Sequence, residues 1–213
     1  MSTFPLIHGA GDGGWYWYLV GAELVRRGHD VVAPDLPADD ESLTLHDYAD
    51  AVAEQIGDRS GLVVVGQSFG AFTAPLVADR LGADALILVA GMVPRPGEPP
   101  GDWWENTGYA EAAQGDDDPY VSFYHDVPRA LADEAMSRER AHPSETSQRE
   151  PWPLADWPEV STRFVLCTED RFFPPAFLRE VVAERLRIVP EEISAGHCVA
   201  LSRPRELAQL LAY

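Results

Sequence analysis

The chain has 213 residues, of which 46% are hydrophobic and 24% charged, so it can bury the core of one α/β domain but not of two large ones. Its formal net charge is −19 and all 16 basic residues are arginine, which excludes strong attraction to phosphate backbones or anionic membranes. Residues 1–5 lack the basic segment of a signal peptide, and the longest apolar run, residues 85–93, is too short to cross a bilayer. We expect a soluble cytoplasmic protein that acts on a small-molecule substrate and has no nucleic-acid or membrane partner. Whether it forms a homodimer is left open.

Short apolar runs alternate with helical patterns along the chain. Strands are predicted at residues 4–8, 30–33, 62–66, 85–90, 163–167 and 187–193. Helices are predicted at residues 16–27, 44–55, 69–81, 175–185 and 204–211, with Thr44 and Asp47 resembling a capping box. Nearly continuous apolar strands that alternate with helices indicate an α/β class with a mostly parallel sheet of about six strands, covered by helices on both faces.

Residues 92–157 interrupt this alternation, because they contain no convincing strand and are rich in proline, glycine, aromatic and acidic residues. We interpret them as a cap or lid insertion within a single domain that spans residues 1–213. Seven acidic residues and no basic residue lie in 98–118, including Asp116, which we interpret as a solvated surface. Four cap aromatics are candidates to line a substrate pocket, although they could equally form the cap's own core: Trp103, Trp104, Tyr120 and Phe123.

The stretch Gly66–Gly70, Gly-Gln-Ser-Phe-Gly, links a predicted strand to a predicted helix. A shuffled chain of this composition would contain about 0.07 matches to Gly-x-Ser-x-Gly, so the motif alone is modest evidence. At a sharp strand-to-helix turn the middle residue is forced into a strained conformation, and the glycines give the backbone room to bend. This context favours Ser68 as a displayed nucleophile, with the Phe69 amide as an oxyanion donor; the alternative is a serine that caps the helix.

A serine nucleophile requires a base and an acid that orients the base. His197 follows the last predicted strand in a short glycine loop, and the other five histidines are expected to be structural or exposed. Asp170 follows a strand between Ser68 and His197, with Glu169 as its close competitor. The second oxyanion donor is expected from the glycine-rich loop at 7–14. Cys167 and Cys198 are predicted to be free thiols, and we expect no metal or other cofactor.

These motifs together resemble the α/β-hydrolase superfamily over nearly the whole chain. Within it, His8–Ala10, Gly13–Tyr18, Gly28–Leu36, Thr168–Pro175 and Gly196–His197 are similar to the small methylesterase and hydroxynitrile lyase group. The resemblance implies a catalytic triad of Ser68, Asp170 and His197, and an oxyanion hole formed by the amides of Ala10 and Phe69.

Two positions depart from the hydroxynitrile lyases of this group. Those enzymes carry a lysine beside the catalytic histidine and a threonine beside the oxyanion loop, where this chain has Cys198 and Gly9. The sequence therefore predicts a serine hydrolase that cleaves an ester of a small or medium organic acid, aromatic acids included. Two alternatives stay open: a same-fold enzyme for carbon–carbon cleavage, decarboxylation or cyclisation, and a non-catalytic small-molecule binder.

Overall fold

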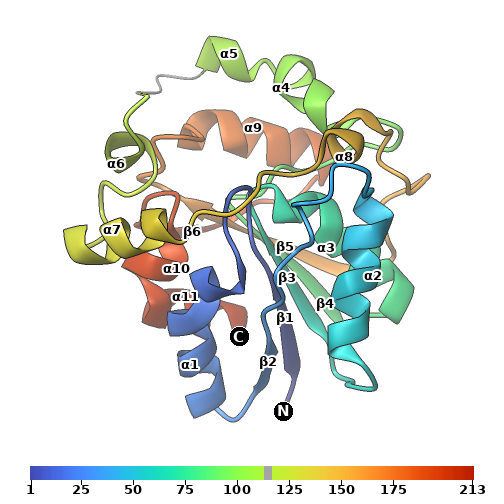
Figure 1. The fold of residues 1–213 in the computed structure, drawn as a ribbon, viewed down its shortest axis with the longest axis horizontal. Coiled ribbons are helices and arrows are strands. Elements are labelled where there is room, and N and C mark those ends of the chain that lie inside the picture. Colours follow the sequence, from blue (N-terminus) through green and yellow to red (C-terminus); the bar gives the residue numbers. More distant parts are fainter. Residues whose placement is uncertain (113–116) are drawn as a thin grey trace.

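A six-stranded sheet forms the centre of the molecule in the computed structural model, which describes residues 1–112 and 117–213 (Figure 1). Its strand order is β2-β1-β3-β4-β5-β6, and every neighbouring pair is parallel. The strands are β1 (Thr3–Ile7), β2 (Asp30–Val32), β3 (Val63–Gln67), β4 (Ala85–Val89), β5 (Ser161–Cys167) and β6 (Glu191–Ile193). Because all strands run the same way, their carboxyl ends meet at one edge, where open α/β sheets carry their sites.

Helices cover both faces of this sheet. The 3-10 helix η1 (Gly14–Trp17), α1 (Tyr18–Arg26), α10 (Val199–Ser202) and α11 (Pro204–Leu211) pack on one face, and α2 (Leu45–Ile56), α3 (Gly70–Leu81) and α9 (Pro175–Arg185) on the other (Figure 1). Side chains alternate along β4, so Leu86 and Leu88 join the core under α2, α3 and α9 while Ile87 and Val89 join the core under α1 and α11. Because alternate side chains enter two buried cores, both sets are apolar, and the strands appear in the sequence as continuous apolar runs.

Local sequence signals begin and end several of these helices. Thr44 and Asp47 form the predicted capping box at the start of α2, with the Thr44 hydroxyl accepting from the Asp47 N–H. Gly82 ends α3 in the left-handed conformation, with φ 60°. Pro175 and Pro204 occupy the first positions of α9 and α11, where a missing N–H costs nothing.

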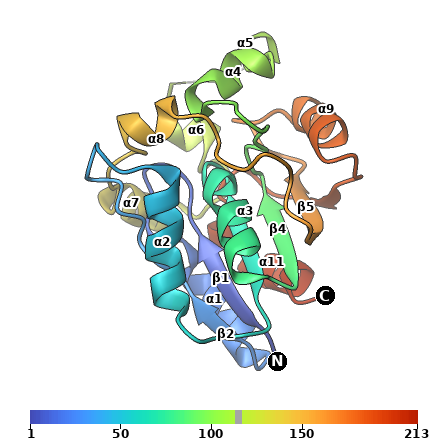
Figure 2. The ribbon, with the colours of Figure 1, turned by 90° about the vertical axis from the view of Figure 1, so that its right-hand side faces the viewer.

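The segment between β4 and β5 forms a cap over the carboxyl ends of the strands, and we call residues 92–157 the cap segment. Its helices lie at the end of the molecule away from the N-terminus in both views (Figure 1 and Figure 2). They are η2 (Pro100–Asp102), α4 (Trp103–Asn106), α5 (Tyr109–Ala112), α6 (Pro119–Ser122), α7 (Arg129–Ser137) and α8 (Glu145–Arg149). Part of the predicted acidic surface, including Asp116, lies outside the described residues.

A buried ion pair fastens the cap segment to α9. Arg185 donates to both carboxylate oxygens of Glu98, at 2.5 and 2.9 Å, and also to the carbonyl oxygen of Val93 at 2.8 Å. Both charged side chains are at least 95% buried. Because each charge is paired and hydrogen-bonded, neither is left uncompensated in the interior.

The observed elements differ from the predicted ones at a few places. The strand expected at 187–193 pairs only over Glu191–Ile193, because Arg187 adopts a left-handed conformation, with φ 58°, and Pro190 has no N–H to donate. The helix expected at 16–27 is the 3-10 helix η1 followed by α1, and α10 has no counterpart among the predicted helices. No helix in residues 1–112 or 117–213 combines the length and hydropathy needed to span a membrane.

Candidate active site

Ser68 stands at the turn between β3 and α3, in a left-handed conformation that non-glycine residues rarely adopt, with φ 49°. The two motif glycines make this turn possible. A Cβ on Gly66 would lie 2.7 Å from the Cβ of Ala74, and one on Gly70 would lie 2.6 Å from the carbonyl oxygen of His8. The Ser68 N–H donates to the Val89 carbonyl at 3.2 Å, which ties the turn to β4. The strained turn therefore fixes Ser68 above the carboxyl ends of the strands.

His197 and Asp170 form a buried hydrogen-bonded pair, and His197 lines the same cavity as Ser68. The Nδ1 atom of His197 lies 2.8 Å from Oδ2 of Asp170. The other carboxylate oxygen, Oδ1, accepts from the N–H groups of Phe172 and Phe173 at 2.8 and 2.9 Å, which fixes its orientation. Glu169 is exposed and accepts from the Ser194 hydroxyl instead. Of the two candidate acids, Asp170 is therefore the one that His197 contacts.

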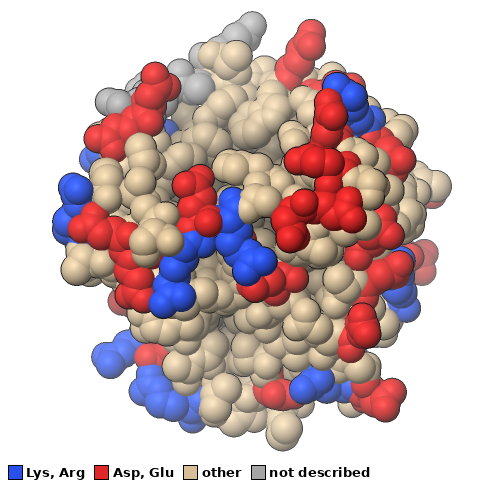
Figure 3. All heavy atoms as spheres, in the orientation of Figure 1, with Lys and Arg blue, Asp and Glu red and all other residues tan. Residues whose placement is uncertain are grey.

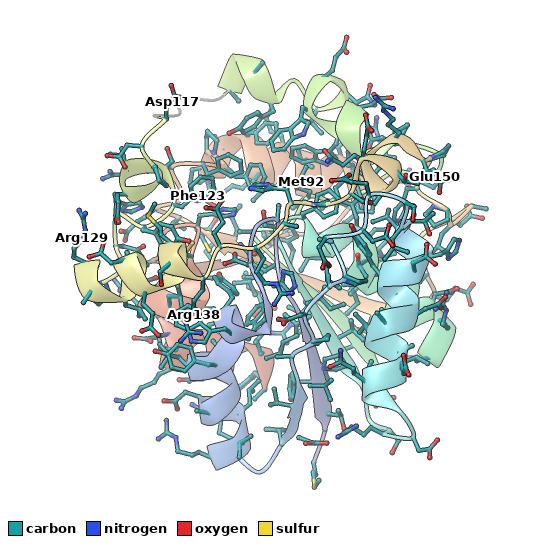
Figure 4. All side chains as sticks on the ribbon, in the orientation of Figure 1. Met92, Asp117, Phe123, Arg129, Arg138 and Glu150 are labelled. Atoms are coloured by element: carbon teal, nitrogen blue, oxygen red, sulfur yellow. The ribbon has the colours of Figure 1, made fainter. Side chains whose placement is uncertain are left out.

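Three aromatic rings surround the His197 imidazole. Phe123, Phe172 and Phe173 present their rings to it at centroid distances of 5.4, 5.2 and 5.3 Å, each close to perpendicular. Phe123 comes from the cap segment, and Figure 4 labels it at the level where the cap meets the strand ends. Edge-on rings keep water away from the imidazole and hold its plane. The cap segment thereby completes the environment of His197.

Gln67, the second residue of the motif, also reaches His197. Its Nε2 lies 3.2 Å from Nε2 of His197, the ring nitrogen that does not face Asp170. Its Oε1 is buried and accepts no hydrogen bond from the described residues. A Cβ on Gly9 would approach that oxygen to 2.5 Å, so the glycine makes room for this side chain. Sequence reasoning assigned Gln67 no role, because a residue inside a turn motif carries no signal of where its side chain points.

Ala10 and Phe69, whose backbone amides are the predicted oxyanion donors, line the same cavity as Ser68. Within the part of the chain that the structure describes, neither N–H donates to a protein acceptor. His8 shapes the loop that carries Ala10, since its Nε2 accepts from the Leu36 N–H at 3.0 Å while its Nδ1 donates to the Gly9 carbonyl at 2.8 Å. Burial lowers the pKa of His8, which favours the neutral ring that these bonds require. Two free amides beside Ser68 can stabilise an oxyanion.

A cavity of about 380 Å³ opens above Ser68, Ala10 and His197, within the size range of small-molecule sites. Of the four candidate cap aromatics, Trp104 and Phe123 line it, together with Met92, which Figure 4 labels between the cap and the strand ends. The other two, Trp103 and Tyr120, are not among its lining residues. Trp103 is fully buried against α9, and its indole N–H donates to the Val93 carbonyl. The Tyr120 hydroxyl bonds Asp133 outside the cavity, with Arg129 stacked on its ring.

Asp12 lines the cavity although sequence reasoning assigned it no role. It accepts no hydrogen bond from the described residues, and burial raises the pKa of its carboxyl to about 7, an effect that His197 opposes and Glu139 reinforces. An acid between glycines in Gly11–Gly13 resembles an ordinary turn residue, so a local pattern does not indicate that Asp12 lines the cavity. A carboxyl with such a shift beside the base is a candidate functional group.

Two neighbouring cap residues hold the loops that carry Asp170 and His197. The N–H of Gly196 donates to Asp126 Oδ2 at 2.8 Å, and His125 Nε2 donates to the carbonyl oxygen of Glu169 at 2.9 Å. His125 is therefore partly buried rather than exposed as predicted. These contacts join the cap segment to both loops of the site.

The two cysteines are free, as predicted, and both are buried. Burial raises the pKa of each thiol well above its usual value, which disfavours the thiolate needed for nucleophilic attack, even at Cys198 beside His197. Among residues 1–112 and 117–213, no group of three or more His, Cys, Asp or Glu side chains is arranged to hold a metal ion.

Comparison with known proteins gives relatives that align over nearly the whole chain. Norfluorocurarine synthase 1 of Strychnos sp is 26% identical over 99% of this chain and 94% of its own length. Methylesterase 7 of Arabidopsis thaliana is 27% identical over 99% of this chain and 95% of its own length. The crystal structure of polyneuridine aldehyde esterase superposes with a TM-score of 0.85 at 22% identity, covering 100% of this chain and 98% of the other.

The fold and the resemblance predicted from the sequence are both confirmed by these comparisons. A family model described as "Alpha/beta hydrolase family" matches residues 6–210, nearly the whole chain. The chain is therefore an enzyme of the alpha/beta hydrolase family.

Proposed function

We propose that this enzyme is a serine esterase that hydrolyses esters of small or medium organic acids through an acyl-enzyme. The observation that carries the proposal is the buried His197–Asp170 hydrogen bond of 2.8 Å at a cavity that a strained Ser68 also lines. Names of relatives such as methylesterase 7 support the same reaction class. A pure binding protein would need neither the strained turn nor the aligned acid and base.

In the proposed first step, Ser68 Oγ attacks the ester carbonyl while His197 Nε2 accepts the serine proton. Asp170 holds the ring so that Nδ1 carries its proton toward the carboxylate, and it stabilises the imidazolium that forms. The carbonyl oxygen becomes negative and accepts from the amides of Ala10 and Phe69. The tetrahedral intermediate then collapses, and His197 delivers the proton to the departing alcohol, which leaves Ser68 acylated.

In the second step, water attacks the acyl group and His197 accepts its proton. Collapse of the second intermediate releases the carboxylic acid and returns the proton to Ser68. The Phe123, Phe172 and Phe173 rings around His197 keep other water away, which strengthens the electrostatic interactions inside the site.

The proposal is tested with Ser68→Ala, assayed with short p-nitrophenyl esters and with a fluorophosphonate probe that labels activated serines. We expect turnover and labelling to disappear while the far-UV circular dichroism spectrum is unchanged. Ser161→Ala, at an exposed position at the start of β5, is the matched control and should behave as wild type. Persistent labelling of Ser68→Ala would place the nucleophile elsewhere.

A further inference from the structure

The cavity above Ser68 is acidic, and no arginine lines it among the described residues. Asp12 forms part of its wall and Glu139 part of its rim, while the chain contains no lysine at all. Arg140 is close in the chain, and its N–H donates to the Gly11 carbonyl, but its guanidinium pairs with Asp35 at 2.6 Å. Within the described residues, no arginine therefore pairs with the Asp12 carboxyl.

Aromatic rings make up much of the remaining wall, contributed by Phe69, Trp104, Phe123, Tyr124 and Phe172. The face of an aromatic ring attracts cations and also packs against apolar groups. A cavity with both rings and carboxyl groups therefore accommodates an organic cation well. A negatively charged acyl or alcohol group would instead meet the Glu139 carboxylate and, once Asp12 is ionised, a second like charge. The chemistry of the wall is selective for charge as well as for shape.

We propose that this enzyme selects ester substrates that carry a protonated or quaternary amine, with the ammonium group bound between Asp12 and the aromatic wall and Glu139 at the entrance. This inference rests on the proposed esterase function for the reacting end of the substrate. It adds the requirement that the substrate carry a positive charge away from the ester group, bound in the same cavity.

The ionisation of Asp12 fits a ligand that brings its own positive charge. In the free enzyme, burial keeps the pKa of the carboxyl near 7, because the charged form lacks a partner. An ammonium ion at this position would supply that partner and favour the carboxylate. The groups that face Asp12 are His197, Glu139, Tyr16, Tyr124 and Cys198, and burial raises the pKa of the last three above their usual values.

Longer-range electrostatics favour the same substrates. Acidic side chains spread over the face seen in Figure 3, with arginine side chains among them, and the whole chain has a net charge of −19. A field of this sign raises the local concentration of cations and their association rate, and salt weakens the effect. Two histidines, His142 and His197, line the cavity, and Nε2 of His142 lies 3.5 Å from Glu139 Oε1.

The test uses pairs of esters that differ only in charge. Acetylcholine and 3,3-dimethylbutyl acetate place the cation or its carbon isostere on the alcohol, and methyl 4-(trimethylammonio)butanoate and methyl 5,5-dimethylhexanoate place it on the acyl side. In at least one pair we expect kcat/KM for the cationic ester to exceed that of its isostere by about tenfold, which corresponds to one partly buried ionic contact with ring contacts. Asp12→Asn should remove most of this ratio, and Glu139→Gln about a factor of two, as is typical of exposed charges.

Glu134→Gln is the matched control, because Glu134 is exposed on α7, pairs with Arg138 and does not line the cavity. The ratio of kcat/KM between the cationic ester and its neutral isostere should be the same in Glu134→Gln as in wild type. Ratios near one in both pairs for the wild type, or an unchanged ratio in Asp12→Asn, would overturn the inference while leaving the esterase proposal intact.

Binding measurements further distinguish the proposed charge selection from the proposed esterase activity. Calorimetric titration of Ser68→Ala with the same four compounds measures recognition without turnover. A tenfold preference for the cationic member, lost in Ser68→Ala/Asp12→Asn, supports the charge selection even if none of the four esters is hydrolysed by the wild type. Equal affinities for both members of each pair would overturn it.

Discussion

Gln67 places its side-chain amide 3.2 Å from Nε2 of His197, the nitrogen that must accept the Ser68 proton in the proposed mechanism. The base is therefore held from both sides, by Asp170 at Nδ1 and by Gln67 at Nε2. The Gln67 N–H and the Ser68 hydroxyl would donate to the same lone pair of Nε2, so the Gln67 contact has to lengthen when the serine proton is transferred.

Gln67→Glu tests whether neutrality at this position is required. A carboxylate beside Nε2 would hold the imidazolium as an ion pair, so His197 could no longer accept the serine proton readily. We expect kcat/KM for p-nitrophenyl acetate to fall by about 100-fold or more, since general base catalysis contributes about that factor. Gln67→Met, which keeps the length without the amide, should lose about tenfold at most. A Gln67→Glu enzyme within threefold of wild type would show that this contact does not affect the base.

Asp170→Asn should lower kcat by about 10⁴, because an amide cannot stabilise the imidazolium and favours the wrong tautomer. Glu169→Gln should change kcat by less than about threefold, since Glu169 is exposed and bonds Ser194 rather than His197. Steady-state kinetics on p-nitrophenyl esters compare the two. A larger loss in Glu169→Gln than in Asp170→Asn would reverse the assignment of the acid.

Asp126 is expected to act as a positioning residue for the His197 loop through its bond to the Gly196 N–H. Asp126→Ala should lower kcat by about 10 to 100-fold with little change in KM, because misplacing the base affects the transition state more than substrate binding. Asp126→Asn keeps an acceptor oxygen and should recover most of the loss. If KM and kcat changed together and asparagine gave no recovery, a general loosening of the cap would be the better explanation.

Asp12 should reduce the stability of the free enzyme at neutral and alkaline pH. Its pKa is raised from 3.8 to about 7, so the folded state retains a proton that the unfolded state has already lost in this interval. The free energy of unfolding therefore falls as pH rises from about 4 to 7 and levels off above that. Asp12→Asn removes this dependence.

We expect the Tm of Asp12→Asn to exceed that of wild type by an amount that grows between pH 5 and pH 7.5 and then stays constant. Each kcal/mol corresponds to about 2–4 °C for a chain of this size. Asp133→Asn, at an exposed position on α7, provides the comparison and should show no such growth toward high pH. A difference in Tm that shrinks as pH rises would contradict the assignment of a raised pKa to Asp12.

The Glu98–Arg185 pair should stabilise the attachment of the cap segment to α9. Glu98→Ala leaves the Arg185 guanidinium buried without its carboxylate, which costs about 3–5 kcal/mol. The double variant Glu98→Met/Arg185→Met removes both charges and should recover a large part of that loss. Urea denaturation gives the three free energies of unfolding. A single variant as stable as wild type would mean that water or Asn106, which donates to Glu98, replaces the missing partner.

Much of the fold could be predicted because its signals are local. Pro175 and Pro204 begin their helices at the predicted residues, and Thr44 and Asp47 form their capping box, since each of these effects needs only neighbours in the chain. The predicted strand at 187–193 is too long because it includes apolar residues such as Val189, which is 90% exposed and does not pair. Pairing depends on the partner strand, which a local pattern does not contain.

The candidate site, like the fold, could be predicted only in part. Ser68, Asp170 and His197 could be selected from their order and from the strands they follow, and the structure brings them to one edge of the sheet. The wall of the cavity could not be predicted in this way. Trp103 and Trp104 are adjacent in the sequence, yet Trp103 points into the core and Trp104 toward the cavity, because α4 has only four residues and its two sides face different surroundings.

Two hydrogen bonds join the cap segment to the loops that carry Asp170 and His197: the Gly196 N–H donates to Asp126, and His125 donates to the Glu169 carbonyl. If the cap segment swung away as a rigid lid, it would withdraw these supports, and the acid and the base would lose their alignment at the moment of substrate entry. In the proposed mechanism, the site reacts only while these supports are in place. We therefore expect that a bulky ester that keeps the cap segment displaced loses turnover rate as well as affinity.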